Sequence, residues 1–143
     1  MTPEQIALVQ ASFASILPIR DQVASSFYER LFTLDPAVRA LFKGDMKRQR
    51  GVLMVAIATV IHGLKNQAAI VPLLEELGRR HVGYGVRPEH YPPVGEALVG
   101  AFAESLGERF AAEVRRAWID AEDMIATSML AGSGRAGAFV RAA

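Results

Sequence analysis

His81 is the residue of this sequence whose surroundings most favour chemistry. Ile70, Leu74 and Leu77 precede it by eleven, seven and four positions, and these spacings place all four side chains on one stripe of a helix. An imidazole at the end of such a stripe lies at the mouth of an apolar pocket. Two roles fit this position: a ligand of a metal cofactor, or a core histidine bonded to a backbone carbonyl.

The remaining composition limits the kind of metal site. The chain has 143 residues, three histidines and no cysteine, which excludes thiolate nucleophiles, iron–sulfur clusters and thioether-linked cofactors. His81 lacks a carboxylate or second histidine at ligand spacing, which disfavours zinc or di-iron. A macrocycle that brings four ligands of its own needs only one from the protein. His62 and His90 fit structural or surface roles.

Helices must position His81. Apolar periodicity predicts helices over about 19–34, 46–64, 70–81, 88–106 and 108–130, after a first helix that begins near residue 3. The segment 46–64 is the most hydrophobic and is expected to be sandwiched between other helices. No stretch alternates as a strand does. The sequence therefore predicts an all-α fold of six or seven helices packed obliquely.

The helix ends carry local signals. Thr2 and Gln5 have the spacing of a capping box, and Asp35 is expected to cap a short segment that starts at Pro36. Gly83 and Gly85 should end the helix that carries His81. We expect one domain over residues 1–131, followed by a frayed tail over 132–143.

Charge and hydropathy restrict the partners and the location. The net charge is +1, which gives no reason to expect a nucleic-acid or anionic-membrane partner. The longest apolar run, residues 52–61, is shorter than the roughly 20 residues of a membrane span. The N-terminus does not have the pattern of a signal peptide. We therefore expect a cytoplasmic protein.

Six motifs occur in a fixed order along most of the chain. They are SFYERLF (26–32), DPAVRALF (35–42), Gln49 with Leu53, LGRRHVGYGV (77–86), HYPPVGEAL (90–98) and AW (117–118). In order and spacing they resemble the globins, and in particular the single-domain bacterial haemoglobins of the Vitreoscilla type and the globin domain of flavohaemoglobins. The resemblance implies a globin fold and a haem b cofactor.

The resemblance assigns roles on both sides of the haem. It implies His81 as the proximal ligand of the iron, Phe42 as the ring that packs on the porphyrin, and Tyr28 as the distal donor to bound dioxygen. Gln49 matches a distal glutamine, although the sequence leaves open whether its side chain points into the pocket. Tyr91 matches a proximal tyrosine.

The walls and the edge of a haem need apolar side chains and cations. Leu53, Leu74, Leu77 and Val94 can supply the walls. Arg80, beside the proximal histidine, is expected to pair with a haem propionate. Further candidate cations for the propionates are Arg79, Lys47 and Arg50.

One position departs from the family pattern. Counting from the AW motif places Ser133 where flavohaemoglobin-like members carry a proximal glutamate. Glu122 and Asp123 precede that position by roughly 15 Å of helix and are not expected to replace it. His81 should then donate to a backbone carbonyl, such as that of Leu77, as in an ordinary globin, or be held partly through Tyr91.

The resemblance implies an oxygen-binding protein first. Dioxygen, nitric oxide and carbon monoxide are the expected ligands, and nitric oxide dioxygenation to nitrate is the enzymatic activity to expect. No flavin and nicotinamide domain follows in the sequence, so electrons should come from an external reductase. Two other functions are compatible with the residues: a haem-based gas sensor or interaction module, and a peroxidase-like haem protein, which Ser133 disfavours.

Overall fold

Six α-helices connected by short 3₁₀ turns make up residues 1–134, the part of the chain that the computed structural model describes. No strand occurs among these residues, which confirms the predicted all-α class. The α-helices are α1 (Pro3–Ile16), α2 (Arg20–Leu34), α3 (Met46–His62), α4 (Gln67–Gly83), α5 (Tyr91–Leu106) and α6 (Ala112–Gly132), and the turns are η1 (Leu17–Ile19), η2 (Pro36–Leu41), η3 (Gly63–Lys65), η4 (Pro88–His90) and η5 (Gly107–Arg109).

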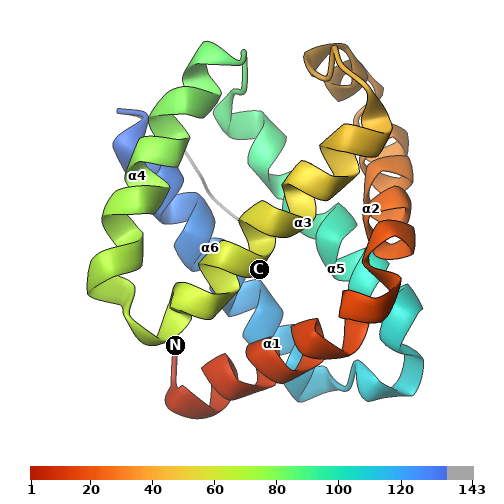
Figure 1. The fold of residues 1–143 in the computed structure, drawn as a ribbon. Helices are drawn as coiled ribbons and strands as arrows, with labels where there is room; N and C mark the ends of the chain where they lie inside the picture. The colour runs from red at the N-terminus through yellow and green to blue at the C-terminus, as the bar shows by residue number, and fades with distance from the viewer. Residues whose placement is uncertain (135–143) are drawn as a thin grey trace.

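The helices form two pairs that two further helices cross (Figure 1). Helix α4 packs against α6, and α2 packs against α5. Helix α1 runs across the base of the molecule. Helix α3 crosses this view diagonally, from the side of α2 to the side of α4. No helix among residues 1–134 combines the length and the apolar character that a membrane span requires.

Two reciprocal glycine contacts fix α4 against α6. A Cβ atom on Gly78 of α4 would overlap the backbone of Met129, and one on Gly132 of α6 would overlap the backbone of Glu75. Because backbone atoms cannot move aside as a flexible side chain can, only glycine permits these helices to come so close. The close approach holds the His81-bearing helix on a rigid support.

The predicted helix ends are confirmed with one exception. The Thr2–Gln5 capping box is present at the start of α1, and α4 ends at Gly83, followed by Gly85 with φ of 90°. The prediction for Asp35 was wrong, since its side chain makes no capping hydrogen bond and the following segment is a 3₁₀ turn. Pro36 accounts for the start of that turn. Most of the predicted tail, residues 135–143, lies outside the described residues.

The prediction that the 46–64 segment is sandwiched between helices was also wrong. Helix α3 buries only Met54 and Ile61 fully, while Val52 and Val55 are 52% and 69% exposed. Neighbouring helices pack against one side of α3, and its apolar composition exceeds what that side requires. Composition therefore did not indicate which faces of the helix are covered.

Candidate functional site

His81 lies in the last turn of α4 and is half-buried. Its Nδ1 donates to the backbone carbonyl of Leu77, 2.7 Å away, which confirms the backbone partner expected for this imidazole. Burial lowers the pKa of His81, against the opposing effect of the bond to Leu77. The ring is therefore held as the neutral tautomer that carries its lone pair on Nε2, the form required of a metal ligand.

Tyr28 and Gln49 form a hydrogen-bonded pair between α2 and α3. Gln49 Nε2 donates to the Tyr28 hydroxyl at 3.1 Å, so the glutamine side chain points towards the tyrosine and not towards solvent. Tyr28 is only 4% exposed, and burial raises its pKa despite the bond from Gln49. The phenol stays protonated, and its hydroxyl keeps one hydrogen to donate.

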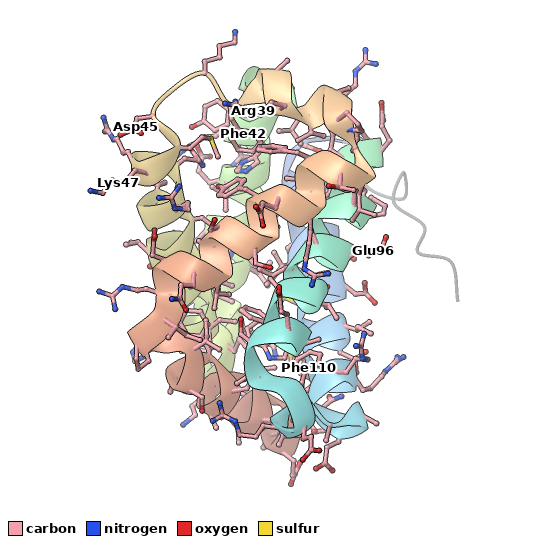
Figure 2. The ribbon with its side chains drawn as sticks, turned by 90° about the vertical axis from the view of Figure 1, so that its right-hand side faces the viewer. Arg39, Phe42, Asp45, Lys47, Glu96 and Phe110 are labelled. Atoms are coloured by element: carbon pink, nitrogen blue, oxygen red, sulfur yellow. The ribbon has the colours of Figure 1, made fainter. Side chains whose placement is uncertain are left out.

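An aromatic cluster surrounds the Tyr28 ring. Phe42 contacts it edge to face with centroids 5.3 Å apart, and Phe32 lies 5.8 Å from both Tyr28 and Phe42. Arg39 Nη1 donates to the Phe42 carbonyl at 2.9 Å, and its guanidinium covers the Phe32 ring. Figure 2 shows Phe42 next to Arg39 near the upper end of the molecule and Lys47 projecting outwards at the start of α3. Sequence reasoning missed Phe32, although its spacing of four from Tyr28 was a usable signal.

The apolar core of residues 1–134 has two parts, and Met124 packs against both. The main core contains Tyr28, and Phe42 and Leu53 pack against it. The second core is centred on Leu74 and Met129, and Leu77 and Tyr91 pack against it. The turn η3 connects α3 and α4, and these two helices pack on different partners. Helix α3 packs on α2, and α4 packs on α6. Of the predicted wall residues, Leu53 therefore packs on the main core, and Leu74 and Leu77 belong to the second core or pack on it.

The ends of the elements that carry these residues approach each other. A Cβ atom built on Gly85, just after α4, would lie 3.3 Å from Cδ2 of Leu41, at the end of η2 and next to Phe42. The segment after His81 thus reaches the segment that presents Phe42. Val94 lies on α5, three residues after Tyr91, and is 36% exposed.

The predicted cations differ in how closely they pair with carboxylates of the chain. Arg50 pairs with Asp21 at 2.9 Å, and Arg79 pairs with Glu76 at 2.8 Å. The hydrogen bond from Arg79 is the largest cause of the lowered pKa of Glu76. Arg80 is exposed and reaches Glu76 only at 3.7 Å, so an anion outside the helix could compete for its guanidinium.

The remaining histidines have structural or surface positions, as expected. His62 is exposed at the end of α3, and Nδ1 of His90 accepts a hydrogen bond from the Arg87 backbone N–H at 2.9 Å. No group of three or more potential metal-ligating side chains occurs within residues 1–134. Among these residues, His81 is therefore suited to a metal whose other ligands come from a cofactor and not from the protein.

Ser133, where the family pattern predicts a glutamate, lies at the end of α6. Ser133 caps the end of α6, and its hydroxyl donates to the Leu130 carbonyl at 2.7 Å. Glu122 is a buried carboxylate, 8% exposed, on the same helix. Its burial was not predicted, and its spacing of four from the buried Trp118 was the available signal.

The aromatic ring next to His81, that of Tyr84, was not predicted either. The centroid of the Tyr84 ring lies 5.5 Å from that of His81. Tyr84 follows Gly83 and precedes Gly85, so sequence reasoning treated it as part of a helix-ending turn. Its proximity to the imidazole depends on how that turn folds back.

The chain is similar in sequence to known proteins over most of its length. A sequence model of the globin family, described as "Globin", matches residues 25–129. The flavohemoprotein of Xylella fastidiosa (strain Temecula1) is 32% identical over 129 residues, which are 87% of this chain and 32% of that protein. The flavohemoprotein of Bordetella parapertussis is 31% identical over 139 residues, 95% of this chain and 34% of that protein. The chain spans about a third of the length of these curated relatives.

Proposed function

The chain belongs to the globin family, and we propose that it is a haem b globin that reversibly binds dioxygen at ferrous iron, with His81 as the protein ligand of the iron. We further propose that it oxidises nitric oxide to nitrate when an external reductase supplies electrons. Carbon monoxide is the third diatomic ligand that such a site would take. The flavohemoprotein relatives support the proposal of a reductase partner.

One observation carries the proposal. An oriented, neutral imidazole lies beside the second core, and the Tyr28–Gln49 pair lies in and beside the main core. Phe42 and Leu77 are both half-buried, and a large apolar disc that lay between them would cover their side chains. The residues present therefore fit a haem. The absence of cysteine supports haem b, which is held without thioether bonds.

Haem, when bound, would supply the metal centre that takes a diatomic ligand and passes on electrons received from the reductase. The Nδ1–H of His81 donates to the Leu77 carbonyl, which fixes the rotation of the ring and leaves Nε2 as the atom that would hold the metal. The carbonyl is a neutral acceptor, and Ser133 supplies no carboxylate to make the imidazole more basic. This environment favours reversible ligand binding over peroxide activation.

On the opposite side, the Tyr28 hydroxyl acts as the donor to a polar ligand. Gln49 donates to the oxygen of that hydroxyl and so orients its hydrogen away from the amide. The neighbouring rings of Phe32 and Phe42 exclude water, which strengthens a hydrogen bond made there. Leu53 extends the same wall, and Tyr91, Leu74 and Val94 provide apolar surface on the side of His81. Arg80 is the candidate partner of a propionate.

Haem titration tests the proposal directly. Purified protein should develop a Soret band on addition of one equivalent of haem, and the ferrous form should shift reversibly with oxygen and carbon monoxide. His81→Ala should retain haem poorly, while His62→Ala, which alters an exposed histidine, should behave as the unaltered protein. A missing Soret band, or equal haem affinity in His81→Ala, would contradict the proposal. Sustained nitrate formation with a reductase in stopped flow would establish the dioxygenase activity, and a single turnover would restrict the function to ligand binding.

A further inference from the structure

Arg39 connects the segment that carries Phe42 to helix α2. It lies in η2, and its Nη1 donates to the Phe42 carbonyl at 2.9 Å. Its guanidinium carbon lies 5.4 Å from the centroid of the Phe32 ring, which belongs to α2. Arg39 and Phe42 lie next to each other in Figure 2. One side chain therefore contacts both the segment at the end of η2 and the helix that carries Tyr28.

The backbone after Phe42 has few other restraints. The Phe42 N–H donates to the Arg39 carbonyl at 3.2 Å, which closes η2, and Phe42 itself is extended, with φ of −103° and ψ of 100°. Regular structure resumes at Met46, where α3 begins. Within residues 1–134, neither Lys43 nor Gly44 takes part in a backbone–backbone hydrogen bond. The bond from Arg39 therefore restrains Phe42 at a point where the main chain supplies no partner.

Arg39 makes different contacts from the other arginines near the site. Arg50 pairs with Asp21, and Arg79 pairs with Glu76, whereas Arg39 makes no ion pair with any residue of the described part of the chain. Its partners are a neutral carbonyl and the face of an aromatic ring. A planar guanidinium can lie on a ring and donate within its own plane, which an ammonium group does not do. These contacts indicate a geometric role.

The place of Phe42 matters because its ring belongs to the aromatic cluster around Tyr28. The two rings meet edge to face with centroids 5.3 Å apart, and Phe42 is the ring that the globin resemblance assigns to the porphyrin. Phe42 is only half-buried, so core packing restrains it incompletely. A side chain that is already in place need not be ordered when a ligand binds, which lowers the cost of binding.

We propose that Arg39 is a positioning residue that keeps Phe42 against Tyr28 in the haem-free protein and thereby slows the loss of bound haem. The inference rests on the proposed haem site with Phe42 as one of its walls. Arg39 acts through Phe42 and need not touch the haem. Without the guanidinium, the Phe42 carbonyl is released and the ring can move away from Tyr28. The hydrogen bond from His81 to Leu77, which lies within α4, is unaffected.

The first measurement uses the haem-free chain. Nuclear Overhauser contacts between the rings of Phe42 and Tyr28 should be present in the unaltered protein and weak or absent in Arg39→Ala. Arg39→Lys keeps the charge without the planar donor group, so it should restore the contacts only in part. The matched control is Arg30→Ala, which alters an exposed arginine of α2 that pairs with Glu104 at 3.1 Å. This variant should leave the contacts unchanged.

The second measurement is the rate at which the haem-loaded chain transfers haem to excess apomyoglobin. Arg39→Ala should lose haem about 3- to 10-fold faster than the unaltered protein, the range expected for one hydrogen bond of ordinary net strength. Arg39→Lys should give an intermediate rate. Arg30→Ala should lose haem at the rate of the unaltered protein.

Three results would overturn the inference. The first is that the contacts between the Phe42 and Tyr28 rings are missing in the unaltered protein or persist in Arg39→Ala. The second is an unchanged rate of haem loss in Arg39→Ala. The third is an equal effect of Arg39→Ala and Arg30→Ala, which would mean that loss of any exposed arginine has this consequence. A missing Soret band in the unaltered protein is a different readout, which would refute the proposed function and, with it, the role in haem retention.

Discussion

Removal of the Tyr28 hydroxyl should accelerate oxygen release. Tyr28→Phe keeps the ring and its contacts with Phe32 and Phe42, so the change is confined to one buried donor. A hydrogen bond to a ligand that carries negative charge contributes about 1.5–3 kcal/mol. Its loss should therefore raise the oxygen dissociation rate by about 10- to 150-fold.

The assay is stopped-flow displacement of oxygen by carbon monoxide from the ferrous protein. Carbon monoxide is less polar than dioxygen, so its own dissociation rate should change much less and serves as the internal control. Gln49→Leu should give a smaller increase, because this change removes the group that orients the hydroxyl. The double variant should then resemble Tyr28→Phe, since the two side chains act as a unit. An unaltered oxygen dissociation rate in Tyr28→Phe would refute the assignment of Tyr28 as the donor.

The remaining predictions concern stability and acid sensitivity. Gly78→Ala should lower the free energy of unfolding, measured by urea denaturation, by about 1–3 kcal/mol, because its Cβ would overlap the Met129 backbone. The control Gly51→Ala, at an open helical position, should be neutral or stabilising by about 0.5–1 kcal/mol. Equal effects of the two substitutions would contradict the packing argument. The lowered pKa of His81 means that the folded haem-free protein binds fewer protons there than the unfolded chain, so this contribution to stability is complete above the unfolded value of about 6.5 and is lost as the pH falls through the folded value. Urea titrations across this range should show a shallower pH dependence in His81→Gln, and an identical dependence would mean that His81 is not the group responsible.

Several features of the fold were predictable because they depend on neighbours in sequence. The capping box at Thr2 and Gln5, the helix end at Gly83 and the apolar stripe through Leu74 all arise within one or a few turns of helix. The hydrogen bond from His81 to the Leu77 carbonyl is of the same kind, since residues four apart on a helix are neighbours. Local spacing is sufficient for such features.

Other features were not predictable because they depend on what lies across the core. The exposure of Val55 follows from the absence of a partner helix on that face of α3, and hydrophobicity alone could not show which face is covered. The pairing of Arg50 with Asp21 joins two helices. The orientation of Gln49 was open in the sequence and is determined by its distance to Tyr28.

The helical class, the imidazole at the end of an apolar stripe and, through the ordered motifs, the globin family all followed from the amino-acid sequence. These are properties of residue type and short-range spacing. Three-dimensional packing was needed to show that Tyr28 and Leu74 belong to different parts of the apolar core, and that the Tyr84 ring lies next to His81. These distances depend on helix crossings fixed by contacts such as that of Gly78 with Met129, between residues that are far apart in the chain.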